Sequence, residues 1–251
     1  MPFTVSHAAA VIPLRKLQLP LAALMIGSMS PDFAYFLPGD TGRVETHSIA
    51  GVFWFCWPVS LAFWLLFVHV LERPTVTLLP ESCRSRFAPS NRKISLSTLA
   101  LASAAVICGA LTHILWDSFT HRGTGIVKAI PALGSVAFYV NGWRVRWFVV
   151  LQHLSSVFGI LVLMVWAWKL PPGRYPRPLA PTVSNATRMS CATILVLASS
   201  SLAIAGYLLN SDTWFLRRLF HFAVGGMTGW LVAWLAIAMV INWRIRLPAN
   251  S

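Results

Sequence analysis

Five long, mostly apolar stretches limit what this chain can fold into. About 20 apolar helical residues cross the hydrocarbon core of a bilayer. Backbone polar groups have no water partners there, so each crossing segment must satisfy its own hydrogen bonds as a helix. We therefore predict an all-α fold, a polytopic transmembrane helical bundle with about five spanning helices. The predicted spans are Ile49–Leu71, Ile94–Asp117, Trp147–Trp168, Met189–Leu209 and Leu219–Trp243.

The charge content agrees with a membrane protein and argues against nucleic-acid binding. Only 11% of the residues are charged, against about a quarter in soluble proteins. The net charge is +13, but the Lys and Arg residues lie between the apolar stretches. That placement favours contact with anionic lipid headgroups. We found no nucleic-acid-binding motif, so the expected partners are membrane lipids, with no nucleic acid.

The N-terminal segment is apolar but interrupted. Residues Leu17–Leu37 contain Pro20 and the pair Pro31-Asp32. We predict a re-entrant or interfacial helix that ends near Asp32, with a full span or a cleaved signal peptide as the alternatives. The chain is then one integral membrane domain, 1–251. Residues 1–47 form the N-terminal segment that carries part of the site, and residues 48–243 form the bundle.

Three connections between the apolar stretches have distinct compositions. Glu72–Lys93 is predicted to be a polar loop, and Pro171–Pro178 a stiff extended linker. The glycine-rich stretch His121–Arg146 is predicted to be a loop over the site. Its cations could meet a phosphate or face lipid headgroups; they are Lys128, Arg144 and Arg146. The four cysteines have no CxxC spacing, and we expect free thiols rather than a zinc-thiolate site.

The second apolar stretch ends in three ionisable side chains at helical spacing. His113, Asp117 and His121 are four residues apart, so they lie along one stripe of a helix. Ionisable groups in a membrane segment are costly and point to a functional site. His121 lies about 12 Å along the axis from His113 on a straight helix. Either the helix breaks near Ser118, or Asp117 bridges to a second ion, or His121 is not a ligand.

Histidines and aspartates converge on one face if the five spans alternate. Five of the seven histidines and Asp32 then lie on the same side of the membrane, and His7 joins them if Leu17–Leu37 is re-entrant. His69 alone lies at the opposite end, where we assign it to the interface. The side chains on the shared face are His7, Asp32, His47, His113, Asp117, His121, His153 and His221. The competing interpretation is that these are polar helix ends that reach water.

The shared face offers mixed nitrogen and oxygen donors. Zinc accepts imidazole nitrogen and carboxylate oxygen and can keep an open position for water, and manganese or iron accepts similar donors. We predict a divalent-metal site, with zinc as the first choice, held by His7, Asp32, His47, His113 and Asp117. For proton transfer we predict His121 or His153.

Several of these segments resemble a bacterial membrane family known as domain of unknown function 4184. They include Met1–His7, Gly27–Asp32, Thr46–Ser48, His113–His121 and Leu151–Val157. A more distant resemblance is to the YdjM-like membrane-bound metal-dependent hydrolases. Two positions depart from that group: Ser6 stands in place of a threonine, and Ala34 in place of a second aspartate.

The resemblance implies a metal site at the five ligands named above, in a protein of the bacterial cytoplasmic (inner) membrane. The leading hypothesis is a metal-dependent hydrolase that acts on a lipid-linked ester or phosphoester at the bilayer surface. One alternative is a metal-ion or proton-coupled transporter, which needs ionisable groups that continue through the bilayer. The other is a membrane assembly factor without catalytic activity.

Overall fold

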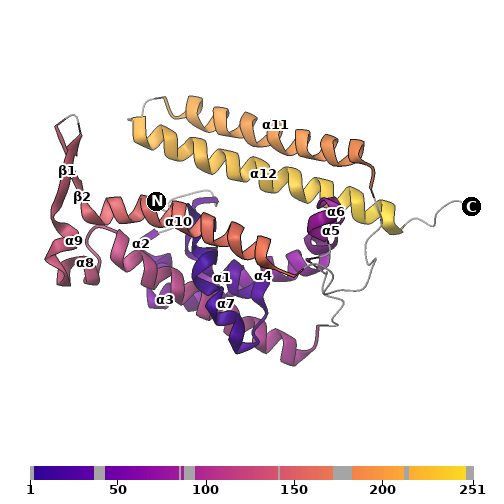
Figure 1. The fold of residues 1–251 in the computed structure, drawn as a ribbon, viewed down its shortest axis with the longest axis horizontal. Helices are drawn as coiled ribbons and strands as arrows, with labels where there is room; N and C mark the ends of the chain where they lie inside the picture. Colours follow the sequence, from indigo (N-terminus) through magenta and orange to yellow (C-terminus); the bar gives the residue numbers. More distant parts are fainter. Residues whose placement is uncertain are drawn as a thin grey trace, which may run out of the picture. The chain divides into compact units, whose positions relative to one another are not determined.

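The computed structural model describes residues 3–36, 43–84, 86–87, 94–140, 142–171, 183–211 and 215–246 (Figure 1). Within those ranges, five helical segments are long and apolar enough to cross a membrane, and this confirms the predicted fold class. They are Ile49–Leu78, Leu96–Ala129, Trp147–Lys169, Asn185–Leu209 and Arg217–Arg244. The predicted linker Pro171–Pro178 lies almost wholly outside the described residues.

Short helical pieces make up the described part of the first 84 residues, and six helices with one hairpin follow. The N-terminal elements are the 3₁₀ helices η1 (Thr4–Val11), η2 (Pro13–Leu17) and η3 (Ser30–Phe36), with α1 (Leu21–Met29) between η2 and η3. The first span region contains α2 (Arg43–Thr46), α3 (Ile49–Gly51), π-helical η4 (Val52–Cys56), α4 (Trp57–Leu66), π-helical η5 (Phe67–Leu71), α5 (Glu72–Leu78) and α6 (Glu81–Arg84). The remaining elements are α7 (Leu96–Thr120), α8 (Gly125–Ala129), α9 (Pro131–Gly134), β1 (Val136–Val140), β2 (Trp143–Arg146), α10 (Trp147–Lys169), α11 (Asn185–Leu209) and α12 (Phe215–Arg246).

The contacts divide the chain into two units. The first contains residues 1–64 and 93–170, and the second contains residues 65–92 and 171–251. The expectation of one domain stays a prediction. All the predicted metal ligands belong to the first unit.

In the first unit, α1 and α7 lie side by side and nearly touch through their backbones (Figure 1). A Cβ added to Gly27 would lie 2.3 Å from the carbonyl oxygen of Val106. A Cβ added to Gly109 would lie 2.3 Å from the carbonyl oxygen of Leu24. Glycine at both positions therefore lets the two helices approach closely, as small residues do in membrane helix pairs.

The helix α1 is too short to cross a bilayer. Its nine residues rise about 14 Å at 1.5 Å per residue, which is under half of the hydrocarbon thickness. Pro20 precedes its first residue, and the chain tightens into η3 at Ser30. Helix α1 alone is therefore shorter than a span, Asp32 lies just beyond its end in η3, and the re-entrant or interfacial placement of this segment stays a prediction.

The first span extends beyond its predicted end at Leu71 and continues to Leu78, through α5. Helix α5 occupies the start of the stretch that was predicted as a polar loop, although Pro74 lies within it. Proline has no N–H to give to the carbonyl four residues earlier, which here belongs to Val70. The side-chain amide of Asn242, in α12, donates to that carbonyl at 2.8 Å. A distant residue thus satisfies the oxygen that Pro74 leaves open.

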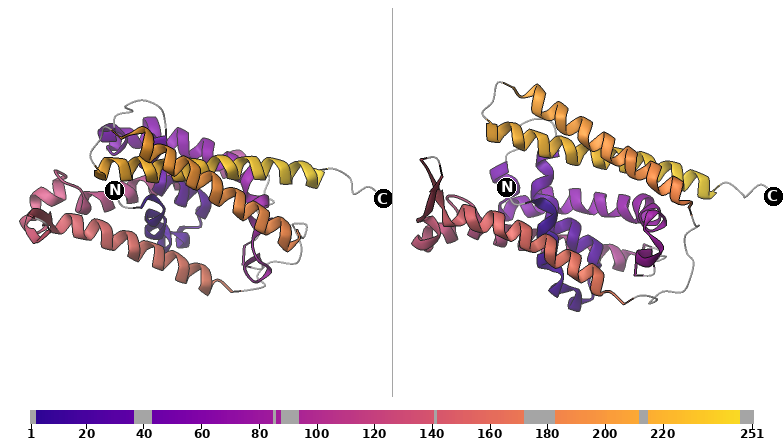
Figure 2. Two further views of the ribbon diagram at one scale, coloured as in Figure 1. Left: turned by 90° about the horizontal axis from the view of Figure 1, so that it is seen from above. Right: turned by 45° about the horizontal axis from the view of Figure 1, so that its top comes forward.

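A helical hairpin forms the rest of the second unit. Helices α11 and α12 lie against each other along most of their length, as Figures 1 and 2 show from three directions. The hydroxyl of Ser199 donates to the carbonyl oxygen of Gly226 across this contact, at 2.8 Å. The helices turn many large apolar side chains outward, including Leu197, Leu209 and Met239, as expected for helices in contact with lipid.

The stretch between α7 and α10 was predicted as a glycine-rich loop, and this was wrong for most of its length. The short helices α8 and α9 follow α7, and β1 pairs with β2 in an antiparallel hairpin. Val140 lies opposite Trp143, and the guanidinium of Arg146 donates to the carbonyl oxygen of Gly134. Only the first residues of the stretch remain a loop at the end of α7.

The close approach of α1 and α7 leads to a test. Alanine at Gly27 or Gly109 is expected to force the helices apart and to lower the free energy of unfolding by about 1–3 kcal/mol, the usual effect of overpacking. Thermal unfolding in detergent measures this. The matched control is Gly134→Ala, because an added Cβ there meets no atom within 4 Å. Equal melting temperatures for all three variants would contradict this account.

Candidate metal centre

The first donor comes from η1, which packs against α10. The backbone N–H of Phe3 donates to the hydroxyl of Ser156 at 3.0 Å. A Cβ on Gly159 would lie 2.7 Å from the carbonyl oxygen of Ser6, so the two segments are in close contact. This contact holds the His7 side chain inward, where only 1% of it is exposed.

Asp32 projects from η3, and a residue of η1 holds it by a hydrogen bond. The hydroxyl of Thr4 donates to Asp32 Oδ2 at 2.7 Å. That bond leaves Asp32 Oδ1 to face the histidines, 3.3 Å from His47 Nε2 and 3.8 Å from His113 Nε2. The carboxyl is almost fully buried, with 3% of the side chain exposed.

His47 is oriented by the residue before it. The hydroxyl of Thr46 donates to the carbonyl oxygen of Pro31 at 3.0 Å, and it lies 3.1 Å from His47 Nδ1. With its hydrogen given to Pro31, the hydroxyl accepts from Nδ1–H of His47. The unprotonated Nε2 of a neutral His47 ring then faces the two carboxylates.

The contact between α1 and α7 orients His113. Its Nδ1 lies 2.8 Å from the carbonyl oxygen of Ser28. A carbonyl can only accept, so Nδ1 carries the hydrogen and Nε2 of the neutral ring carries the lone pair. Backbone carbonyls fix metal-binding histidines in this way. His7 stacks on His113, with ring centroids 3.8 Å apart and planes 19° apart.

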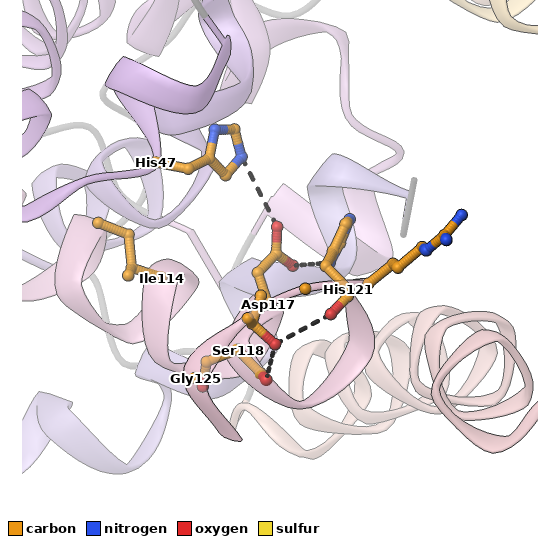
Figure 3. A pocket seen from close by; sticks show the side chains of 9 residues that line it. His47, Ile114, Asp117, Ser118, His121 and Gly125 are labelled. Carbon is orange, nitrogen blue, oxygen red and sulfur yellow. Dashed lines mark hydrogen bonds and ion pairs between the residues drawn. The ribbon is translucent and has the colours of Figure 1, made fainter. Parts of the chain in front are cut away.

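Asp117 connects the donors through its two oxygens (Figure 3). Its Oδ2 lies 3.3 Å from His113 Nε2 and 3.6 Å from His47 Nε2. Its Oδ1 lies 3.6 Å from His7 Nε2 and 3.5 Å from His121 Nδ1. In Figure 3, His47 and His121 are directed toward the carboxylate from different sides.

The arrangement fits a divalent cation. Ligand atoms bound at about 2.0–2.1 Å in a tetrahedral site are about 3.4 Å apart, close to the separations between these nitrogens and oxygens. Lone pairs of imidazole nitrogen that face carboxylate oxygens repel each other unless a proton or a cation lies between them. Two groups have donor atoms that all lie within 4.8 Å of one another. They are His7, Asp32 and His113, and His47, His113 and Asp117.

Protonation states of the two groups outside the spans suit ligation. Burial, and then the neighbouring His113, lower the pKa of His7 to about 3, so its ring is neutral near pH 7. Burial opposes ionisation of Asp32, but His47 and His113 rings that carry a proton, and the Thr4 hydroxyl, hold the pKa of that carboxyl below its usual range. A metal ion would take the place of those ring protons. A neutral imidazole and an ionised carboxylate are the forms that bind metal.

One side of the cluster opens to a pocket of about 620 Å³, a typical volume for a ligand site. His113 and His7 are the most deeply buried donors, with 0% and 1% of their side chains exposed. His47 and His121 line the pocket and are 16% and 19% exposed. An ion among these donors would therefore be enclosed on one side and reachable from the other.

The position of His121 follows from where α7 ends. Helix α7 continues through Ser118 to Thr120, so a helix break near Ser118 is wrong. His121 follows with extended backbone angles, φ −120° and ψ 140°, and its N–H still donates to the carbonyl oxygen of Asp117 at 3.0 Å. Its ring lies against Asp117, four residues earlier, with Nδ1 3.5 Å from Oδ1.

The other predicted residues lie elsewhere. His153 is exposed on α10 and belongs to neither donor group. His69, assigned to the interface, is exposed in η5, and His221 lies in α12; both are in the second unit. Three residues that orient the donors were not among the predicted site residues: Thr4, Thr46 and Ser28. Thr4, three residues before His7, carried no signal of this role.

The fold and the donor cluster define an integral membrane protein with a candidate metal centre. Residues 1–242 match the family described as Domain of unknown function (DUF4184). The chain belongs to this family, as the sequence resemblance predicted. No curated protein and no solved structure matches the chain.

Metal content gives the first test of the centre. The protein purified in detergent and loaded with zinc is expected to hold about one ion, which His113→Ala and Asp117→Ala should each release. The reason is that both residues face several other donors. Inductively coupled plasma mass spectrometry measures the ion. His69→Ala is the matched control, and metal retained in both cluster variants would rule this centre out.

A second test concerns the residue that orients Asp32. Thr4→Val removes the hydroxyl that bonds to Asp32 Oδ2 and keeps a similar shape. Loss of such outer partners weakens metal binding about 10- to 100-fold. Competition with a fluorescent zinc chelator measures the affinity. Thr4→Ser keeps the hydroxyl and should bind nearly as wild type does; equal weakening in both variants would show that packing, not the hydrogen bond, matters.

Proposed function

We propose that the chain is a metal-dependent hydrolase of the bacterial cytoplasmic membrane. Its substrate would be a lipid-linked ester or phosphoester at the bilayer surface. One observation carries the proposal: His47 and Asp117, two of the clustered nitrogen and oxygen donors, line an open pocket. Catalytic zinc sites keep a position open for water, whereas structural sites are closed.

His113, Asp117, His47, Asp32 and His7 would hold the ion, with zinc as the first choice and manganese or iron as alternatives. A bound ion of this kind polarises a substrate oxygen and lowers the pKa of bound water toward neutrality. The stacked His7 and His113 rings exclude water from the inner side of the centre. Substrate would therefore approach from the pocket.

His121 is the residue best placed to move a proton. It lines the pocket, and its Nδ1 lies 3.5 Å from Asp117 Oδ1. With Nδ1–H directed at the carboxylate, Nε2 is the basic nitrogen. In the reaction, the water oxygen bonds to the phosphorus or acyl carbon and the bond to the alcohol oxygen breaks. His121 takes a proton from the water and gives it to the leaving alcohol.

A transporter is less well supported by the described part of the chain. The donors gather in one cluster in the first unit, and His69 in the second unit is exposed. A transport path needs ionisable groups that continue across the bilayer. Uptake of zinc by proteoliposomes, lost in Asp117→Ala, would favour transport over hydrolysis.

Turnover tests the proposal directly. The zinc-loaded protein is expected to hydrolyse short-chain lipid esters or phosphoesters, and chelation should abolish this. His121→Gln should keep its zinc but lose about 100-fold or more in kcat, because general acid–base groups contribute at least that much. Product release measured by chromatography, beside zinc content, checks both statements. His69→Ala should match wild type. Turnover that survives chelation would refute the proposal.

A further inference from the structure

The pocket beside the donors is lined by a cation, Arg122, that was not among the predicted site residues. Its lining contains His47, Asp117 and His121 on one part, and residues 122–125 with Ser118 and Ile114 on the other. Among the described residues that line it, Arg122 is the only Lys or Arg and Asp117 the only acidic residue. Of the three cations first considered for phosphate contact, none lines the pocket.

Arg122 is available to a ligand. It is exposed, and it makes no hydrogen bond or ion pair with any residue in the described part of the chain. Two other charged residues have partners already: Asp117 faces four histidines, and Arg146 bonds to the carbonyl oxygen of Gly134. A guanidinium that has no partner among the residues the structure describes, beside a possible metal centre, is therefore open to an anionic group.

The backbone on both sides of Arg122 is anchored. The N–H of His121 donates to the carbonyl oxygen of Asp117 at 3.0 Å. The hydroxyl of Thr124 lies 2.6 Å from the carbonyl oxygen of Ser118 and 2.9 Å from that of His121. These bonds tie the loop back to the last turn of α7. The Arg122 side chain thus starts from a backbone fixed relative to Asp117.

The chemistry of guanidinium selects the ligand. Its planar array of N–H groups pairs with two oxygens of a phosphate at once. A phosphoester carries negative charge before the reaction, and more develops on its oxygens in the transition state. A neutral carboxylic ester offers no such charge when it binds. The guanidinium of Arg122 is therefore better suited to bind a phosphoester than a carboxylic ester.

Resting on the proposed function, we infer that Arg122 binds a substrate phosphate beside His121 and Asp117, and so makes the centre specific for phosphoesters. One oxygen of the phosphate would face the donor cluster, and two others would meet the guanidinium. The phosphate could belong to a lipid headgroup or to a soluble ester. Both bring the same group to Arg122.

Binding of inorganic phosphate to the zinc-loaded protein in detergent tests this inference, with isothermal titration calorimetry as the readout. Arg122→Ala should weaken phosphate binding about 10- to 100-fold, as loss of charged hydrogen bonds does, and leave the zinc content unchanged. Arg122→Lys keeps the charge but loses the paired geometry, so it should lie between. The control is Lys128→Ala, which removes an exposed cation outside the pocket lining.

Competition for the phosphate site by dihexanoyl phosphatidic acid and by glycerol 3-phosphate shows whether the phosphate belongs to a lipid headgroup or to a soluble ester. Stronger displacement by the lipid points to a headgroup, and equal displacement to a soluble ester. Equal phosphate affinity in wild type and Arg122→Ala would overturn the inference, even if zinc binding and ester hydrolysis persist. Absence of zinc binding would instead overturn the proposed function, and calorimetry on the zinc-free protein would still decide the role of Arg122.

Discussion

The hydrogen bond between His113 and the carbonyl oxygen of Ser28 is the interaction on which the rest of the site depends. It forms because Gly27 and Gly109 let the backbones of α1 and α7 approach closely. Since a carbonyl only accepts, the bond sets the tautomer of His113 and turns Nε2 toward both aspartates. The packing of two helices and the chemistry of the centre are thus set by the same contact.

Burial of the donor cluster carries a cost in free energy. Two carboxylates and three imidazoles lie close together where little water reaches them, and an unpaired charge in such a place costs several kcal/mol. The structure meets part of that cost with Thr4 on Asp32 and Thr46 on His47. A divalent ion would meet the remainder, because it attracts every donor at once. The polar residues around the donors lower the free-energy cost of the buried charges in the same way.

The spans and the main candidate donors could be predicted from the sequence. The contacts that hold the helices together and orient the donors could not. Apolar length alone locates the spans, and the spacing of His113 and Asp117 marks one helix face. The close contact of α1 with α7 needs two glycines 82 positions apart, which no local pattern links. Asn242 offsets the effect of Pro74 from a distant helix, so α5 was missed. Arg122 was overlooked because only the folded loop places it at the pocket.

The separation of 85 positions between Ser28 and His113 has a consequence for biosynthesis. The ribosome makes α1 and Asp32 well before α7 exists, and N-terminal segments generally fold first. Until α7 is inserted, a nine-residue helix followed by a carboxylate has no stable place in hydrocarbon. Helix α1 can therefore reach its place beside α7 only after α7 has been made. An ion captured by the finished cluster would then lock the N-terminus in place and mark the completion of insertion.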